Sequence, residues 1–232
     1  MREMLLQNIP AKIDRKKLLS SLHLKEETED GQRVLELAHE AEKIANPKGL
    51  ARVADIDSKH EDKVVIEGIT FPSRVMAINL KDAYRVFPFV ATCGRELEQW
   101  AKSLPDFLEQ FWATQIQEIV LQEAHRFLQA YLKQEFQIKK LSSMNPGSLG
   151  DWPMEEQRKL FTLLGDTYQK VGVELTESFL MVPMKSISGI FFPTQVDFEN
   201  CQLCSRSHCP GRRAPFNPEL LQEKYKLDKK LS

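Results

Sequence analysis

Three cysteines near the end of the chain have a spacing suited to binding one metal centre. Two residues separate Cys201 from Cys204, and Cys209 follows within the reach of a loop. A structural zinc ion takes four ligands, and His208 could complete the set beside three thiolates. A four-iron cluster would lack one protein ligand unless the distant Cys93 supplied it. The spacing therefore predicts an iron–sulfur cluster or zinc, and the alternative is a group of reduced cysteines.

The residues around these cysteines support the same prediction. Arg206, Arg212 and Arg213 would favour the thiolate forms that a metal requires. The segment from Asp197 to Phe216 contains little apolar material that could dock it on a core. Because ligand binding and folding are coupled in such segments, we expect this one to be ordered only when it holds a metal.

Two acidic residues occupy positions where the pattern predicts apolar side chains. Glu123 falls on the stripe of a long helix predicted over 106–136, with Ile116 and Phe127 as neighbours on that stripe. Glu177 alternates with apolar residues in a strand predicted over 173–182. Burying a carboxylate is costly without a partner, so the two acids predict one polar cleft that binds a cationic ligand. The alternatives are a stripe edge where Glu123 pairs with an arginine, and a bulge that turns Glu177 outward.

The periodicity predicts the elements that hold these residues. Helices are expected over 14–22, 29–45, 94–102 and 106–136 and from Asp151 onward, two or three strands over 50–89, one strand over 173–182, and loops over 139–150 and 183–189. With no internal repeat, this order indicates an α+β protein. We divide it into an N-terminal helical segment (1–46), a central α+β domain (47–195) and a cysteine-containing tail (196–232).

The composition excludes several classes of protein. The chain has 232 residues, 42% of them hydrophobic, and a net charge of -1 with interspersed charges, which argues against a nucleic-acid surface. Lys-rich positions near the end are best explained as a solvated tail. The sequence contains neither an apolar run of the ~20 residues that cross a bilayer nor a signal peptide, so we expect a cytoplasmic protein. Dinucleotide, P-loop and hydrolase motifs are also absent from the sequence.

A series of short motifs carries a resemblance to a known family. In order along the chain they are Pro146-Gly147, Asp151-Trp152-Pro153, Leu175-Thr176-Glu177-Ser178-Phe179, Met181-Val182-Pro183 and Ser186-Ile187-Ser188-Gly189. This order and spacing resembles the activation domain of cobalamin-dependent methionine synthase, and in particular its free-standing relatives. The likeness extends over roughly 90–193 and is fainter over 50–90.

The resemblance implies a bent antiparallel β-sheet with flanking helices and S-adenosylmethionine in a shallow groove. It implies that Glu123 lies near the amino or sulfonium group of that ligand and that Pro146-Gly147 forms the adjacent loop. The cofactor-binding residues of the matching motifs would also include Glu177, Ser178, Pro183, Ser188 and Gly189.

The sequence departs from the family pattern in the same loop. Ser143 and Ser148 stand where the family has an Arg before the Pro-Gly pair and a Tyr after it. The Arg anchors the carboxylate of the ligand, so we expect weak binding of S-adenosylmethionine unless Lys139, Lys140 or Lys185 replaces it. The chain also lacks the Asp-x-His-x-x-Gly segment that supplies an axial histidine to a corrinoid, so cobalamin would arrive only on a partner protein.

The resemblance therefore predicts an accessory protein for corrinoid-dependent methyl transfer. It would support reductive reactivation of cob(II)alamin on a partner protein, with S-adenosylmethionine as methyl donor. The electron would come from the iron–sulfur centre or from flavodoxin or ferredoxin. The alternative is a non-catalytic module that binds a corrinoid protein and uses zinc or an iron–sulfur site structurally.

Overall fold

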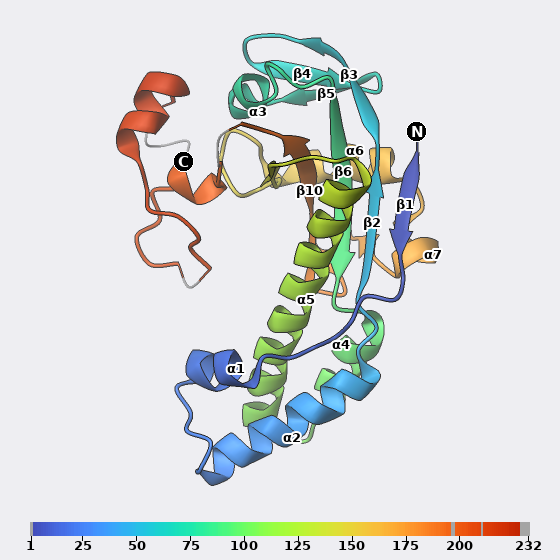
Figure 1. The fold of residues 1–232 in the computed structure, drawn as a ribbon, viewed down its shortest axis with the longest axis vertical. Coiled ribbons are helices and arrows are strands. Elements are labelled where there is room, and N and C mark those ends of the chain that lie inside the picture. Colours follow the sequence, from blue (N-terminus) through green and yellow to red (C-terminus); the bar gives the residue numbers. More distant parts are fainter. Residues whose placement is uncertain (1, 196–197, 210, 228–232) are drawn as a thin grey trace.

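The molecule has a C-shaped outline in which one long helix connects two ends. The structure, a computed structural model, describes residues 2–195, 198–209 and 211–227. Figure 1 shows the β-sheet at one end of the molecule, helices α1 (Arg15–Leu22) and α2 (Glu29–Ile44) at the other, and α5 (Phe107–Glu135) running between them. The described residues after 197, called the C-terminal segment from here on, lie beside the sheet.

The described strands include an eight-stranded antiparallel sheet centred on one strand, β6 (Arg85–Thr92). One edge of β6 pairs with β2 and then β3, and its other edge pairs with β10, which in turn carries the edge strand β7. The remaining bounds are β1 (Glu3–Leu6), β2 (Lys48–Arg52), β3 (Ala54–Lys59), β4 (Lys63–Ile66), β5 (Ile69–Pro72), β7 (Leu141–Met144) and β10 (Ser186–Pro193). The predicted α+β class with a bent antiparallel sheet and flanking helices is confirmed.

The predicted helices begin where side chains can satisfy their first backbone N–H groups. The Asp14 carboxylate accepts from Lys17 N at the start of α1, and the Thr28 hydroxyl accepts from Gly31 N at the start of α2. The other helices are α3 (Arg74–Asn79), α4 (Arg95–Ser103), α6 (Gln157–Leu164) and α7 (Thr167–Val171), with short turns at Met154–Glu156, Asn200–Gln202 and Leu220–Lys224. None of the helices in the described ranges has the length and apolar content needed to cross a membrane.

The sheet separates two hydrophobic cores. Side chains alternate along β6, so Phe87 and Phe89 face the first core while Val86 and Val90 face the second. The first core contains α1, α2, α4 and most of the buried face of α5. The second contains α3, α6, α7 and the C-terminal segment. Helix α5 and the C-terminal segment therefore lie on opposite faces of the sheet.

The N-terminal residues are part of the first core and of the sheet. Strand β1 pairs with β2, and Leu18 of α1 and Leu37 of α2 are fully buried in the same cluster as Ile116 of α5. The apolar stripe that predicted the second helix packs on α5.

Three predicted elements are wrong in detail. The segment expected as a loop over 139–150 contains β7, whose four side chains are buried against β10 and its surroundings. The strand expected over 173–182 is a hairpin of two short strands, β8 (Glu174–Leu175) and β9 (Met181–Val182). The run 186–189, also expected as a loop, begins β10. Short strands with serines at their centre carry little β signal, which explains two of these errors.

The segment over 50–89 holds more strands than predicted. Strands β3, β4 and β5 lie wholly within it, together with most of β2 and half of β6, and α3 follows β5. These strands are only four to eight residues long. Tight turns such as Glu67–Gly68, where both residues have positive φ, join them too closely for periodicity to resolve.

The C-terminal segment is docked by apolar side chains. Phe198, Leu203, Leu221 and Tyr225 are buried in the second core, and the last two of these have no exposed surface. The sequence-based expectation that this segment needs a metal for order overlooked anchors beyond Phe216. Asp197 and the lysines at 229–230 lie outside the described residues.

Candidate functional site

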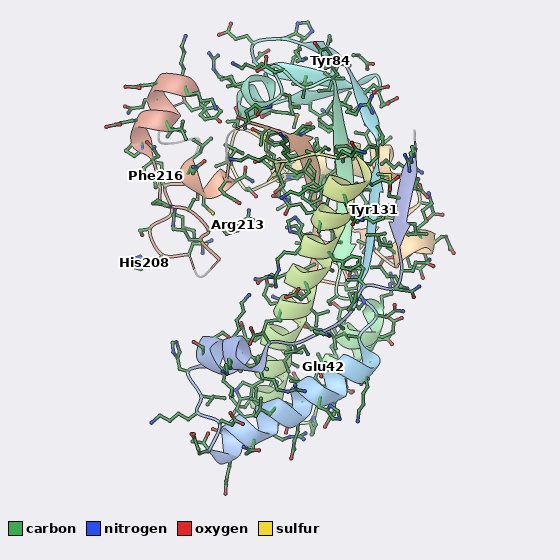
Figure 2. The ribbon with its side chains drawn as sticks, viewed as in Figure 1. Glu42, Tyr84, Tyr131, His208, Arg213 and Phe216 are labelled. Atoms are coloured by element: carbon green, nitrogen blue, oxygen red, sulfur yellow. The ribbon has the colours of Figure 1, made fainter. Side chains whose placement is uncertain are left out.

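A groove opens at the edge of the sheet, between α5 and the C-terminal segment. Its volume is about 250 Å³, and its walls combine charged, polar and apolar side chains: His125, Arg126, Gln129, Leu141, Ser142, Ser143, Phe198, Glu199 and Arg213. Figure 2 shows Arg213 on the side of the C-terminal segment that is turned toward α5. We take this groove as the candidate site.

The edge strand β7 forms the floor of the groove. Ser143 is paired with Phe191, which belongs to the first core, and Ser142 is paired with Phe192 of the second core. Paired residues of antiparallel strands share a face, so Ser143 faces the α5 side and Ser142 the other side. The Ser142 hydroxyl accepts a 3.2 Å hydrogen bond from Phe198 N, which holds the C-terminal segment against the strand.

His125 forms part of the α5 wall and is neutral at physiological pH. Its ring packs beside Phe89 and Phe191, with centroid distances of 5.3 and 5.1 Å. Burial lowers the pKa of His125 to about 4, and the positive charge of Arg213 lowers it further in the same direction. The buried Nε2 has no hydrogen-bond partner among the described residues. The imidazole therefore adds no positive charge to the groove.

Two ion pairs border the groove. Arg126 pairs with Glu123 one turn earlier on α5, and the Nε of Arg213 lies 3.0 Å from Glu199 Oε2. The side chains of these four residues keep between 32% and 60% of their surface exposed, so they can reach a ligand. Two guanidinium groups and two carboxylates thus stand within one small region.

Glu123 lies at the edge of the apolar stripe, where it pairs with an arginine. The buried stripe of α5 runs through Ile116, Val120, Ala124 and Leu128. Phe127, which the pattern placed inward, is 42% exposed. The structure therefore places Glu123 beside the stripe and next to Arg126 of the groove wall.

The structure brings four of the predicted residues together beyond the end of β7. Pro146-Gly147 follows that strand, and Ser188-Gly189 lies in β10 next to it, where Asn145 Nδ2 donates a 2.8 Å hydrogen bond to the Ser188 carbonyl. Gly189 is required there, because a Cβ would lie 2.6 Å from Asn145 Nδ2 and closer still to the Met144 carbonyl oxygen.

Three other predicted residues lie in the β8–β9 hairpin or next to it. The turn at 176–180 interrupts the alternation, so Glu177 and Ser178 are exposed and do not line the groove. The Glu177 carbonyl accepts from Arg158, and the carbonyl of buried Pro183 accepts from the Ser186 hydroxyl at 2.8 Å. The inference that Glu123 and Glu177 share a cleft rested on an unbroken strand, which the structure does not contain.

Comparisons with known proteins show similarity to one family. Residues 100–200 match the family model for the vitamin B12 dependent methionine synthase, activation domain. This part of the chain is thus similar to that activation domain. The fold is similar to a crystal structure described as the MetH reactivation domain bound to AdoHcy, with a TM-score of 0.67 and 16% identity over 86% of this chain and 81% of that one. A search of curated proteins gave no match.

The segment that matches the family model contains nearly all of the groove. Every residue that lines it falls between 100 and 200 except Arg213. Arg213 is thus a contribution from the segment beyond the match. The likeness places α5, β7 and the start of the C-terminal segment in the shared part of the fold.

The predicted metal centre is not supported. Cys201, Cys204 and Cys209 are all described as free thiols, and no three His, Cys, Asp or Glu side chains within the described ranges are placed to hold a metal ion. The Arg212 guanidinium donates to the carbonyls of Cys201, Cys204 and Arg206, and Arg213 N donates to Cys201 Sγ. Hydrogen bonds from Arg212 and Arg213 therefore hold the cysteine-containing loop, where the spacing predicted a metal.

Sequence reasoning missed most of the groove. His125 and Arg126 directly follow Glu123, so the helix that drew attention to the acid also carried them. Arg213 was noted only as a neighbour of the cysteines, and Glu199 not at all. Glu199 and Arg213 reach the groove only because of the position of the C-terminal segment, for which the sequence contains no local signal.

Proposed function

We propose that this protein supports the reductive reactivation of cob(II)alamin on a partner corrinoid protein, with S-adenosylmethionine bound in the groove as methyl donor. The observation that carries the proposal is the position of the groove, whose lining residues other than Arg213 lie within the segment that matches the activation domain. The similar structure is described as bound to AdoHcy, the product that S-adenosylmethionine becomes when it loses its methyl group.

The chemistry needs one electron and one methyl group. A reduced flavodoxin or ferredoxin would supply the electron that converts cob(II)alamin to cob(I)alamin. The electron pair of cob(I)alamin then attacks the methyl carbon, so a cobalt–carbon bond forms while the carbon–sulfur bond breaks. Its electron pair stays on sulfur, which gives S-adenosylhomocysteine. The role of this chain is to bind and orient the methyl donor toward the corrinoid.

In this proposal a partner protein brings the corrinoid. The sequence lacks the Asp-x-His-x-x-Gly segment for an axial ligand, and the groove of about 250 Å³ is smaller than the 300–1,000 Å³ of typical ligand pockets. The groove suits part of a ligand such as S-adenosylmethionine, with the remainder lying toward the partner.

The test combines a binding and a reactivation measurement. Calorimetry should detect binding of S-adenosylmethionine and S-adenosylhomocysteine to the full chain. With a corrinoid protein in the cob(II)alamin state and titanium(III) citrate as electron donor, radiolabelled methyl groups should pass from S-adenosylmethionine to cobalamin faster when the chain is present. Arg126→Trp, which fills the groove from an exposed helix position, should abolish both effects.

The matched control is Gln134→Trp, an exposed position near the end of α5 that does not line the groove. It should bind and act like the wild type. Absence of S-adenosylmethionine binding together with an unchanged rate of methylation would reject the proposal. A chain that binds the corrinoid protein but not S-adenosylmethionine would instead be a non-catalytic binding module.

A further inference from the structure

We propose that the groove binds the zwitterionic end of an α-amino-acid ligand, with the carboxylate held by Arg126 and Arg213 and the ammonium group at Glu199. The inference deepens the proposed function, on which it rests for the identity of the rest of the ligand. In the activation-domain family, an Arg at the position of Ser143 anchors the ligand carboxylate. The inference gives this role to Arg126 and Arg213, which lie outside that loop.

The proposed binding of the ligand carboxylate rests on the two arginines of the groove. Both side chains line the groove, Arg126 from α5 and Arg213 from the C-terminal segment. A guanidinium carries five N–H donors in a planar fork that matches a carboxylate. Among the described residues, the Nε atom of Arg213 forms the ion pair with Glu199. Its two Nη groups can therefore take a carboxylate while that ion pair persists.

The proposed binding of the ligand ammonium group rests on the carboxylates near the groove. Glu199 lines the groove and keeps 39% of its side-chain surface exposed, and Glu123 stands behind Arg126. The charged groups at the groove are thus two guanidiniums and two carboxylates, with His125 neutral. A neutral zwitterion matches this balance, whereas a phosphate dianion would add two negative charges to a groove whose own charges already cancel.

The small residue at the family Arg position leaves room for this arrangement. Ser143 lies on the floor of the groove and faces α5. A long side chain at 143 would occupy part of the groove that Arg126 and Arg213 also line. Of the lysines considered as replacements, Lys185 is held by Glu118 at 3.0 Å, and neither Lys139 nor Lys140 lines the groove.

The position of Arg213 is fixed by the fold of its segment. Arg212 donates to the carbonyls of Cys201 and Ala214 at 3.1 Å, and Arg213 N donates to Cys201 Sγ at 3.4 Å. Leu203 on the other side of this loop is fully buried in the second core. The backbone that carries Arg213 is therefore held in place before a ligand binds, which lowers the entropic cost of binding.

Calorimetry with variants tests the assignment. Arg126→Gln and Arg213→Gln should each weaken binding of S-adenosylmethionine by roughly tenfold to a hundredfold, since each removes a charge-assisted contact. Arg213→Lys should restore part of the loss. The control Arg206→Gln, an exposed arginine of the same loop outside the groove, should bind within about twofold of the wild type. Binding of 5′-methylthioadenosine, which lacks the amino-acid end, should not depend on either arginine.

A second probe separates this inference from the proposed function. L-methionine at millimolar concentration should shift the His125 ring resonances in the wild type and not in Arg213→Gln, whose thermal midpoint is compared first. If methionine behaves so while S-adenosylmethionine does not bind, the inference stands and the proposed function fails. If S-adenosylmethionine binds equally to the wild type and both glutamine variants, the inference is overturned and the proposed function stands. If neither compound binds, both are overturned.

Discussion

The phenol of Tyr225 donates a 2.6 Å hydrogen bond to Asn79 Oδ1, and this contact joins the C-terminal segment to α3 across 146 positions of sequence. The Tyr225 ring is fully buried, and it packs beside Phe198 with a centroid distance of 6.1 Å. Because Phe198 also lines the groove, Tyr225 supports one groove wall through this ring contact.

Replacing Tyr225 should loosen the C-terminal segment in proportion to what is removed. Tyr225→Phe loses one hydrogen bond and should lower the free energy of unfolding by about 1 kcal/mol. Tyr225→Ala removes a buried ring and should cost about 3–5 kcal/mol. Urea denaturation measures both changes, and limited proteolysis should show faster cleavage after residue 198 in the alanine variant. Equal stability of the two variants would contradict the anchoring role.

Chelators should leave the C-terminal segment intact. Its buried anchors and the hydrogen bonds of Arg212 hold it, so EDTA should not change the rate of tryptic cleavage within 198–227. The triple variant with Cys201, Cys204 and Cys209 changed to Ser should be equally resistant. Arg212→Ala should accelerate cleavage, because at least three backbone carbonyls lose their donor. Faster cleavage on adding EDTA to the wild type would restore the metal hypothesis.

His125 should make the stability depend on pH. Its pKa is about 4 in the folded chain against 6.5 when unperturbed, so the unfolded state binds more protons between these values. The contribution of neutral His125 to the free energy of unfolding is fully present above pH 6.5. It should decrease by up to about 3 kcal/mol as the pH falls to 4. In His125→Gln this part of the slope should disappear, while the contribution of the carboxylates remains. Denaturant titrations at several pH values compare the two slopes, and identical slopes would argue against a neutral buried imidazole.

Gly189→Ala should disturb the junction of β7 and β10. The added Cβ would overlap the Met144 carbonyl oxygen and lie 2.6 Å from Asn145 Nδ2. Overpacking of this kind costs about 1–3 kcal/mol and should move the Pro146-Gly147 loop. Thermal unfolding and calorimetry with S-adenosylmethionine measure both effects. Gly211→Ala meets open space and is the control that should change neither.

Sequence periodicity predicted the long elements and failed on the short ones. The stripe of α2 and the caps at Asp14 and Thr28 are local signals, and these helices lie where they were expected. Strand β7 contains two serines and owes its conformation to pairing with β10 at a distance of about 50 residues. The hairpin turn after Leu175 likewise depends on hydrogen bonds between Thr176 and Leu180 that no alternation reveals.

Asp151 illustrates why the site could be predicted only in part. The sequence suggested that it opens its own helix. In the structure its carboxylate accepts from the Ser73 hydroxyl and from the backbone N–H groups of Arg74 and Val75, at the start of α3. The sequence thus indicated that Asp151 lies at the start of a helix. The residues whose groups it accepts hydrogen bonds from, at the start of α3, lie 76 to 78 positions earlier in the chain. Glu123 was found in the same way from the pattern of its own helix, while Glu199 and Arg213, which line the groove from the C-terminal segment, were not.

The separation of the two cores by the sheet has a consequence for the dynamics of the protein. Arg126 stands on a helix of the first core and Arg213 on a segment anchored in the second, so a ligand between them spans two regions that could open separately. Occupancy would then slow amide hydrogen exchange in the C-terminal segment by the factor 1 + [L]/Kd, without a comparable effect on α2. A small ligand bound at the sheet edge would in this way link the stability of the two cores.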